Sequence, residues 1–120
     1  MENILIKVLD FTEYPDVRYI EQDENSGEQF YYDVVKPNYE KAISENKILL
    51  VDLDNTAGYA SSFLDEAFGN LVYDFEYKNI ISHLKIKSEQ EPDWIEIIFN
   101  EILPSWKKKN EKGNPRKEVK

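Results

Sequence analysis

The chain of 120 residues contains no cysteine and a single histidine, His83. The absence of cysteine excludes a disulfide scaffold, thiolate catalysis and any zinc or iron–sulfur site with cysteine ligands. One histidine cannot supply a metal site built from several imidazoles, and Ser-His-Asp catalysis would have to use His83 itself. Because His83 lies between apolar neighbours on an expected strand, we interpret it as a structural or surface residue.

Long hydrophobic segments are also absent. No run approaches the ~20 apolar residues that span a bilayer, and the N-terminus lacks the basic and apolar regions of a signal peptide. The sequence therefore predicts a cytoplasmic domain with no membrane partner. Its length is that of one domain, which buries about two thirds of its unfolded surface.

Basic residues are scarce in most of the chain and concentrated at its end. Residues 107–120 carry 7 Lys/Arg and 2 Glu, a net charge of +5, whereas residues 1–106 carry 8 Lys/Arg and 22 Asp/Glu, a net charge of −14. An acidic surface repels phosphate backbones and anionic lipid, so the basic end is the only part suited to nucleic acid. The composition predicts a folded domain over 1–106 and a disordered tail over 107–120.

Hydrophobic periodicity predicts strands that alternate with helices. The expected strands are residues 3–9, a short 17–20, a central 47–53 and 79–87. One expected helix begins after Ser26, and Pro37 either kinks it or begins a second helix. Further helices are expected after Ser62, covering 63–74, and at Pro92, the last ending or bending at Pro104. The order is roughly β-(β)-α-β-α-β-α, which predicts an α/β fold with a mostly parallel four- to five-stranded sheet and helices packed on it.

The run at 47–53 is nearly continuously apolar, as in a strand that is buried on both faces. In parallel sheets the functional loops lie beyond the carboxyl ends of the strands. Here that position belongs to residues 54–62, so we expect the functional site in this loop and at the start of the helix that follows it.

Two family resemblances compete for this loop. The string Ile-Leu-Leu-Val-Asp-Leu-Asp-Asn-Thr at 48–56 resembles the first motif of haloacid-dehalogenase-type phosphatases. That resemblance would make Asp52 the nucleophile, Asp54 the general acid/base and Mg²⁺ the cofactor. The chain after Thr56 offers no Asp-Asp or Gly-Asp-x-x-x-Asp element to complete the motif set.

The second resemblance covers nearly all of residues 1–90. It rests on Asp-Phe-Thr at 10–12, Arg-Tyr at 18–19, Ser-Gly-Glu-Gln-Phe at 26–30 and Val-Asp-Leu-Asp-Asn-Thr-Ala-Gly-Tyr-Ala-Ser-Ser-Phe-Leu-Asp-Glu-Ala-Phe-Gly-Asn-Leu at 51–71. Together these segments resemble the bacterial STAS-like family of small domains. The resemblance implies a STAS fold related to anti-sigma-factor antagonists, and a partner of the histidine-kinase-like ATPase class.

In anti-sigma-factor antagonists an Asp-Ser-Ser-Gly turn carries a serine that a partner kinase phosphorylates. The resemblance places Ala60, Ser61, Ser62 and Phe63 at those four positions, so Ser62 becomes the candidate switch. A helix N-terminus would tolerate a phosphate there. The other candidate residues for partner binding lie in the loop or just after it: Ser61, Tyr59, Thr56, Gly58, Asp65 and Glu66.

Structural roles for the same residues stay open at this point. Ser62 has the spacing of an N-cap, which is worth about 1 kcal/mol. Asp52 and Asp54 could stabilise the turn at 55–58 or contact Arg18. A nucleotide-binding STAS variant is a third hypothesis, but the chain lacks a Gly-x-x-x-x-Gly-Lys-Ser/Thr loop. We expect a non-enzymatic regulatory domain without a cofactor or metal, which binds a protein partner through residues 54–62 and the first turns of the next helix.

Overall fold

The sheet has three parallel strands in the computed structural model, which describes residues 1–117. They are β1 (Asn3–Lys7), β2 (Ile48–Asp52) and β3 (Leu84–Lys87), in the spatial order β1-β2-β3. The parallel α/β prediction and the central position of β2 are confirmed, whereas the expected four to five strands are wrong for the described residues. In the register, Ile6 lies beside Val51 and Val51 beside Ile86.

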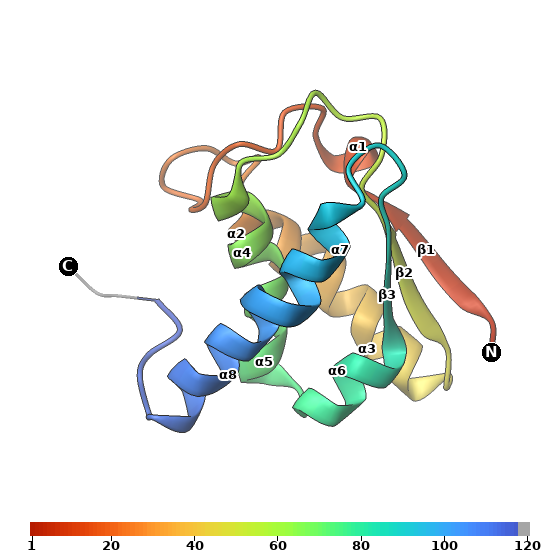
Figure 1. The fold of residues 1–120 in the computed structure, drawn as a ribbon, viewed down its shortest axis with the longest axis vertical. Helices are drawn as coiled ribbons and strands as arrows, with labels where there is room; N and C mark the ends of the chain where they lie inside the picture. The colour runs from red at the N-terminus through yellow and green to blue at the C-terminus, as the bar shows by residue number, and fades with distance from the viewer. Residues whose placement is uncertain (118–120) are drawn as a thin grey trace.

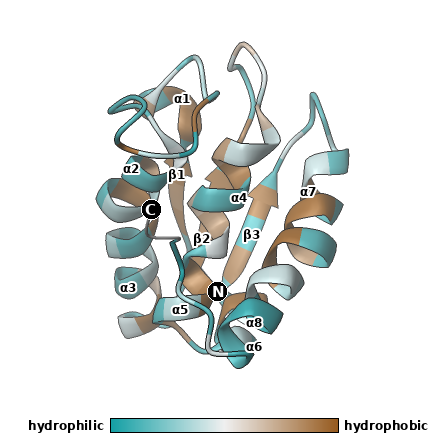
Figure 2. Cartoon of the chain, turned by 90° about the vertical axis from the view of Figure 1, so that its left-hand side faces the viewer, coloured by the Kyte–Doolittle hydropathy of each residue, from teal (hydrophilic) through white to brown (hydrophobic). Residues whose placement is uncertain are grey.

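The helices cover one face of this sheet. In Figure 1, α2 (Gly27–Phe30), α4 (Ser61–Gly69) and α7 (Asp93–Ile97) lie to the left of the strands, and Figure 2, turned by 90°, shows α4 in front of β2. Side chains of a strand alternate between its two faces. The buried Ile6, Leu49, Val51, Leu84 and Ile86 therefore share the covered face and belong to the hydrophobic core.

The first long helical run begins where the capping pattern predicted. Ser26 accepts a hydrogen bond from the Gln29 N–H at 3.0 Å, and α2 continues through the π-helical turn η1 (Tyr31–Val35) into α3 (Lys36–Ser44). The run passes through Pro37 because the turn before it is widened: the Lys36 N–H donates to the Tyr31 carbonyl, five residues back. This geometry relieves the clash that a proline ring makes inside an ordinary α-helix.

The last helical run passes its proline in the same way. From α7 the chain continues through η2 (Ile98–Ile102), where the Leu103 N–H donates to the Ile98 carbonyl, into α8 (Leu103–Glu111). The helix therefore does not end at Pro104, and residues 107–111 of the expected tail are helical. The buried Trp106 holds α8 on the core. Residues 118–120, the end of the expected tail, lie outside the described residues.

Four further sequence predictions need correction. The strand expected at 3–9 stops at Lys7 and is followed by α1 (Val8–Phe11). The strand expected at 17–20 is a loop, whose Val17 and Arg18 carbonyls accept hydrogen bonds from the first N–H groups of α2.

Residues expected as the first part of a strand at 79–87 form α6 (Tyr77–His83) instead. Ile80 is buried and Ile81 is 46% exposed, as on one side of a helix. The helix expected over 63–74 begins at Ser61 and divides at Asn70 into α4 and α5 (Leu71–Asp74). No helix within residues 1–117 combines the length and apolar character needed to cross a bilayer.

Candidate functional site

The root of the loop between β2 and α4 is held by the Asp54 carboxylate. Asp54 accepts hydrogen bonds from the Gln90 N–H (3.0 Å) and the Glu89 N–H (3.1 Å) and lies 3.4 Å from the Lys87 ammonium. Burial alone would raise the pKa of Asp54, but these donors lower it below its ordinary value. The carboxylate thus ties the end of β2 to the segment after β3.

Asp52 helps to hold the same end of the loop. Its Oδ1 accepts a hydrogen bond from the Asp54 N–H at 2.9 Å, and its Oδ2 lies 3.6 Å from the Lys87 ammonium. The proposed contact of Asp52 and Asp54 with Arg18 is absent from the ion pairs of residues 1–117, because Arg18 bonds to α4. Within the same residues, no three His, Asp or Glu side chains gather in a way that could hold a metal ion.

Further along, the loop turns through left-handed backbone. Asn55 has φ +71° and Gly58 has φ +123°, a region that favours glycine. The Thr56 hydroxyl accepts a hydrogen bond from the Gly58 N–H at 3.3 Å. Gly58 and Thr56 therefore shape the turn.

Tyr59 lies half-buried at the end of the loop. Its hydroxyl donates to the Leu53 carbonyl at 2.6 Å, and its ring packs on Phe63 and Trp94. Burial raises the pKa of its hydroxyl. The ring that sequence reasoning offered as a surface anchor is thus engaged within the domain.

Ser61 and Ser62 form the first turn of α4. The helix begins after Ala60, which has no side-chain cap, so the expectation that Ser62 is the N-cap is wrong. Neither serine hydroxyl has a hydrogen-bond partner in the described part of the chain. Ser61 is exposed and Ser62 is half-buried. The two hydroxyls thus stand at the helix start without a structural bond.

One turn later, α4 carries an internal ion network. The Arg18 guanidinium lies 2.6 Å from an Asp65 oxygen and 3.1 Å from a Glu66 oxygen. The other Asp65 oxygen accepts from the Trp106 indole at 3.0 Å, and Glu66 also accepts from Asn70. Burial raises the pKa of Glu66 although Asn70 and Arg18 oppose it. With 2% of its side chain exposed, Glu66 is part of the interior.

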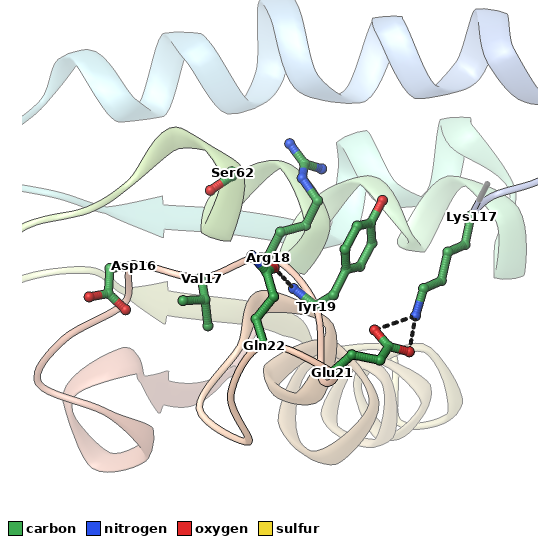
Figure 3. Close-up of a pocket in the computed structure, with 8 residues that line it drawn as sticks. All are labelled: Asp16, Val17, Arg18, Tyr19, Glu21, Gln22, Ser62 and Lys117. Atoms are coloured by element: carbon green, nitrogen blue, oxygen red, sulfur yellow. Dashed lines mark hydrogen bonds and ion pairs between the residues drawn. The ribbon is translucent and has the colours of Figure 1, made fainter. Parts of the chain in front are cut away.

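A cavity of about 660 Å³ opens beside this turn (Figure 3). Ser62 and Asp16 line one part of it, and the Tyr19 ring lies between them and Lys117. Lys117 pairs with Glu21 at 2.8 Å and with Glu28 at 3.1 Å. A second hollow of about 430 Å³ is lined by Ser61, and Arg18 borders both. The two serines therefore line different hollows, both of which Arg18 borders.

Sequence reasoning placed the loop and Ser61 to Glu66 together correctly along the chain, but it missed Arg18 as the residue that joins them to the segment before α2. One signal was available. Arg18 is the only cationic residue between Lys7 and Lys36, among eight acidic ones. A lone cation in such a segment is expected to be held by carboxylates. Lys117 carried no comparable signal, since it lies in a segment rich in lysine.

Comparison with known proteins gives one family match. The model of the family described as "STAS-like domain of unknown function" matches residues 26–94, from the cap of α2 to the first turn of α7 and including the whole loop between β2 and α4. No curated protein and no solved structure matches the chain significantly. The match covers more than half of the sequence and agrees with the parallel sheet and packed helices. The chain therefore belongs to the family of STAS-like domains of unknown function.

Proposed function

We propose that this STAS-like domain is a non-enzymatic regulatory module that binds a protein partner through the first turn of α4 and the adjoining loop. The observation that carries the proposal is the pair of serine hydroxyls, Ser61 and Ser62, which have no hydrogen-bond partner in the described residues. A serine at a helix start ordinarily caps the helix. Here the helix forms without that bond, which leaves both hydroxyls available to a partner or to a kinase.

Ser62 is the proposed switch within this surface. It lies three residues before Asp65, so the two side chains are neighbours on the helix surface. A phosphate on Ser62 would gain from the helix dipole, and it would compete with Asp65 for Arg18. Since Asp65 also holds the Trp106 indole, added charge would act on the contact between α4 and α8. Phosphorylation of Ser62 would thus affect how α8 packs on α4.

The arrangement of Asp52 and Asp54 gives no support to the phosphatase alternative. The Asp54 oxygens are engaged by two backbone N–H groups and Lys87, and an Asp52 oxygen is engaged by the Asp54 N–H. These bonds account for both carboxylates as fastenings of the loop. The surface they position is suited to recognition.

The family resemblance suggests a histidine-kinase-like ATPase as the partner class. The test uses a purified ATPase of this class encoded beside the gene for this protein. With Mg²⁺ and ATP, mass spectrometry should find phosphate on Ser62 and none on the Ser62→Ala protein. By calorimetry, Ser62→Asp should weaken binding about tenfold or more, because a charge buried in an interface without a partner exceeds ~1.4 kcal/mol.

The matched control is Ser82→Asp, which adds the same charge at an exposed serine on α6. It should bind as the wild type does. Equal affinity of the wild type and Ser62→Asp, together with no phosphate on Ser62, would refute the proposed switch. All variants should first be shown to melt at the wild-type temperature, so that a loss of binding is not a loss of fold.

A further inference from the structure

The N-terminal segment exposes an unusual share of apolar surface. Met1, Leu5 and Leu9 are 72%, 52% and 38% exposed, at intervals of four residues. Leu5 is the middle residue of β1, and β1 is an edge strand of the sheet. In Figure 1 no helix or strand of residues 1–117 lies beyond β1 on its outer side. An apolar edge strand without a cover is a surface suited to pairing with another strand.

The hydrogen-bond pattern shows which backbone groups are free at this edge. The Ile48 N–H donates to the Glu2 carbonyl at 3.0 Å, so Glu2 points its carbonyl at β2. Successive residues of a strand direct their backbone groups to opposite edges. Asn3, Leu5 and Lys7 therefore direct their N–H and carbonyl groups away from β2. The Lys7 carbonyl begins the hydrogen bonds of α1, whereas both backbone groups of Asn3 and Leu5 and the Lys7 N–H have no backbone partner within residues 1–117.

We propose that β1 pairs with β1 of a second copy of this chain, antiparallel about a two-fold axis at Leu5. In that register Leu5 faces Leu5 of the second copy, and Asn3 faces Lys7. Leu5 would exchange both of its N–H···O=C bonds with Leu5 of the second copy, as in a hydrogen-bonded antiparallel pair, and the free Lys7 N–H would donate to the Asn3 carbonyl of the other copy. The pairing would join the two sheets into one continuous sheet.

The side chains fit the same register. On the uncovered face, the two Leu5 side chains meet, and each Lys7 meets an amide, so no like charges stand directly opposite. Met1 precedes β1 and Leu9 follows it in α1, so exposed apolar residues flank the paired strands at either end. A hollow of about 240 Å³ beside β1, lined in part by Leu5, Phe11 and Val34, leaves space for the added strand.

The test is the self-association of the full chain, measured by sedimentation equilibrium over about a hundredfold range of concentration. The wild type should reach twice the mass of one chain. Leu5→Pro removes an outward N–H and leaves the bonds to β2 intact, and Leu5→Arg places like charges opposite each other. Each should weaken self-association about tenfold or more.

The absence of cysteine allows a direct test of the register. A hydrogen-bonded antiparallel pair separates its Cα atoms by about 5.5 Å, within disulfide range, so Leu5→Cys should form a disulfide-linked dimer on mild oxidation. Ile81→Arg and Ile81→Cys are matched controls at an exposed isoleucine on α6 and should behave as the wild type and stay uncrosslinked.

A wild type that stays monomeric throughout would overturn the proposal and leave this edge to a strand of another protein. A dimer that survives both Leu5→Arg and Leu5→Pro, with no disulfide at Leu5→Cys, would place the interface elsewhere. Far-UV circular dichroism at low concentration checks that each variant is folded, and Leu5→Arg decides the outcome if Leu5→Pro unfolds. None of these results depends on the function of Ser62.

Discussion

The starts of α2 and α4 lie against each other, and they are built in opposite ways. At α2, Ser26 is fully buried and caps the helix, and Gly27 packs so closely on Phe63 that a Cβ at Gly27 would lie 2.2 Å from the Phe63 carbonyl oxygen. At α4, the helix begins after Ala60 with no side-chain cap, and Ser61 is exposed. One helix start is fixed by packing and hydrogen bonds, whereas the other leaves its polar groups to solvent.

The difference assigns different roles to two serines that look alike in the sequence. Both precede a helical pattern and have a Gln or Asp three residues later, at Gln29 and Asp65. The Ser26 hydroxyl accepts a hydrogen bond from the Gln29 N–H and caps α2. Ser62 caps no helix, and the Asp65 side chain bonds to Arg18 and Trp106. A polar residue that a fold does not use is a candidate for recognition, and the three predictions below test this contrast.

The largest loss of stability is expected at the start of α2. Gly27→Ala would force its Cβ into the backbone of α4, and overpacking of this kind destabilises by about 3 kcal/mol. Urea unfolding of the variant measures the loss. Gly113→Ala is the control, because a Cβ there meets nothing within 4 Å and only its φ of +78° is unfavourable. A Gly27→Ala protein as stable as Gly113→Ala would show that the α2 start is looser than described.

A smaller loss of stability is expected at the base of the loop between β2 and α4. Asp54→Asn should cost about 2 kcal/mol at pH 7, because the charged carboxylate accepts two backbone hydrogen bonds. Folding lowers the pKa of Asp54. Its contribution is therefore complete above the unfolded pKa of about 4 and is lost as the pH falls through the lower folded value.

Urea unfolding from pH 7 to pH 2 separates this effect from others. The Asn variant should lose part of the decline in stability below pH 4, while Asp10→Asn, at an exposed site, should keep the wild-type profile. Identical profiles for the wild type and Asp54→Asn would mean that the carboxylate does not fasten the loop.

Part of this architecture could be predicted from the sequence. The short apolar run of β2 and the Ser26–Gln29 cap are local signals, and both predictions are confirmed. The sequence of α6 fits a strand as well as a helix, because a buried Ile80 beside an exposed Ile81 is compatible with both. Pro37 and Pro104 break helices by local rules, yet the π-helical turns before them let both runs continue.

The sequence predicted the contiguous residues of the site but not the contact with Arg18, which comes from a distant segment. The loop and the serines are contiguous, so their proximity follows from the sequence. Arg18 is 47 residues from Asp65, and no local pattern reports that distance. The exact first residue of α4 was also beyond local rules, because the spacing of Ser62 and Asp65 is satisfied equally by a capping serine and by a serine within the first turn of a helix.

The most direct test of the central claim is the matched pair Ser26→Ala and Ser62→Ala, compared by urea unfolding at pH 7. Ser26→Ala removes a cap and should cost about 1 kcal/mol, whereas Ser62→Ala removes no hydrogen bond within the described residues and should stay within about 0.5 kcal/mol of the wild type. A Ser62→Ala loss equal to that of Ser26→Ala would return Ser62 to a structural role and contradict the claim that this helix start is reserved for a partner.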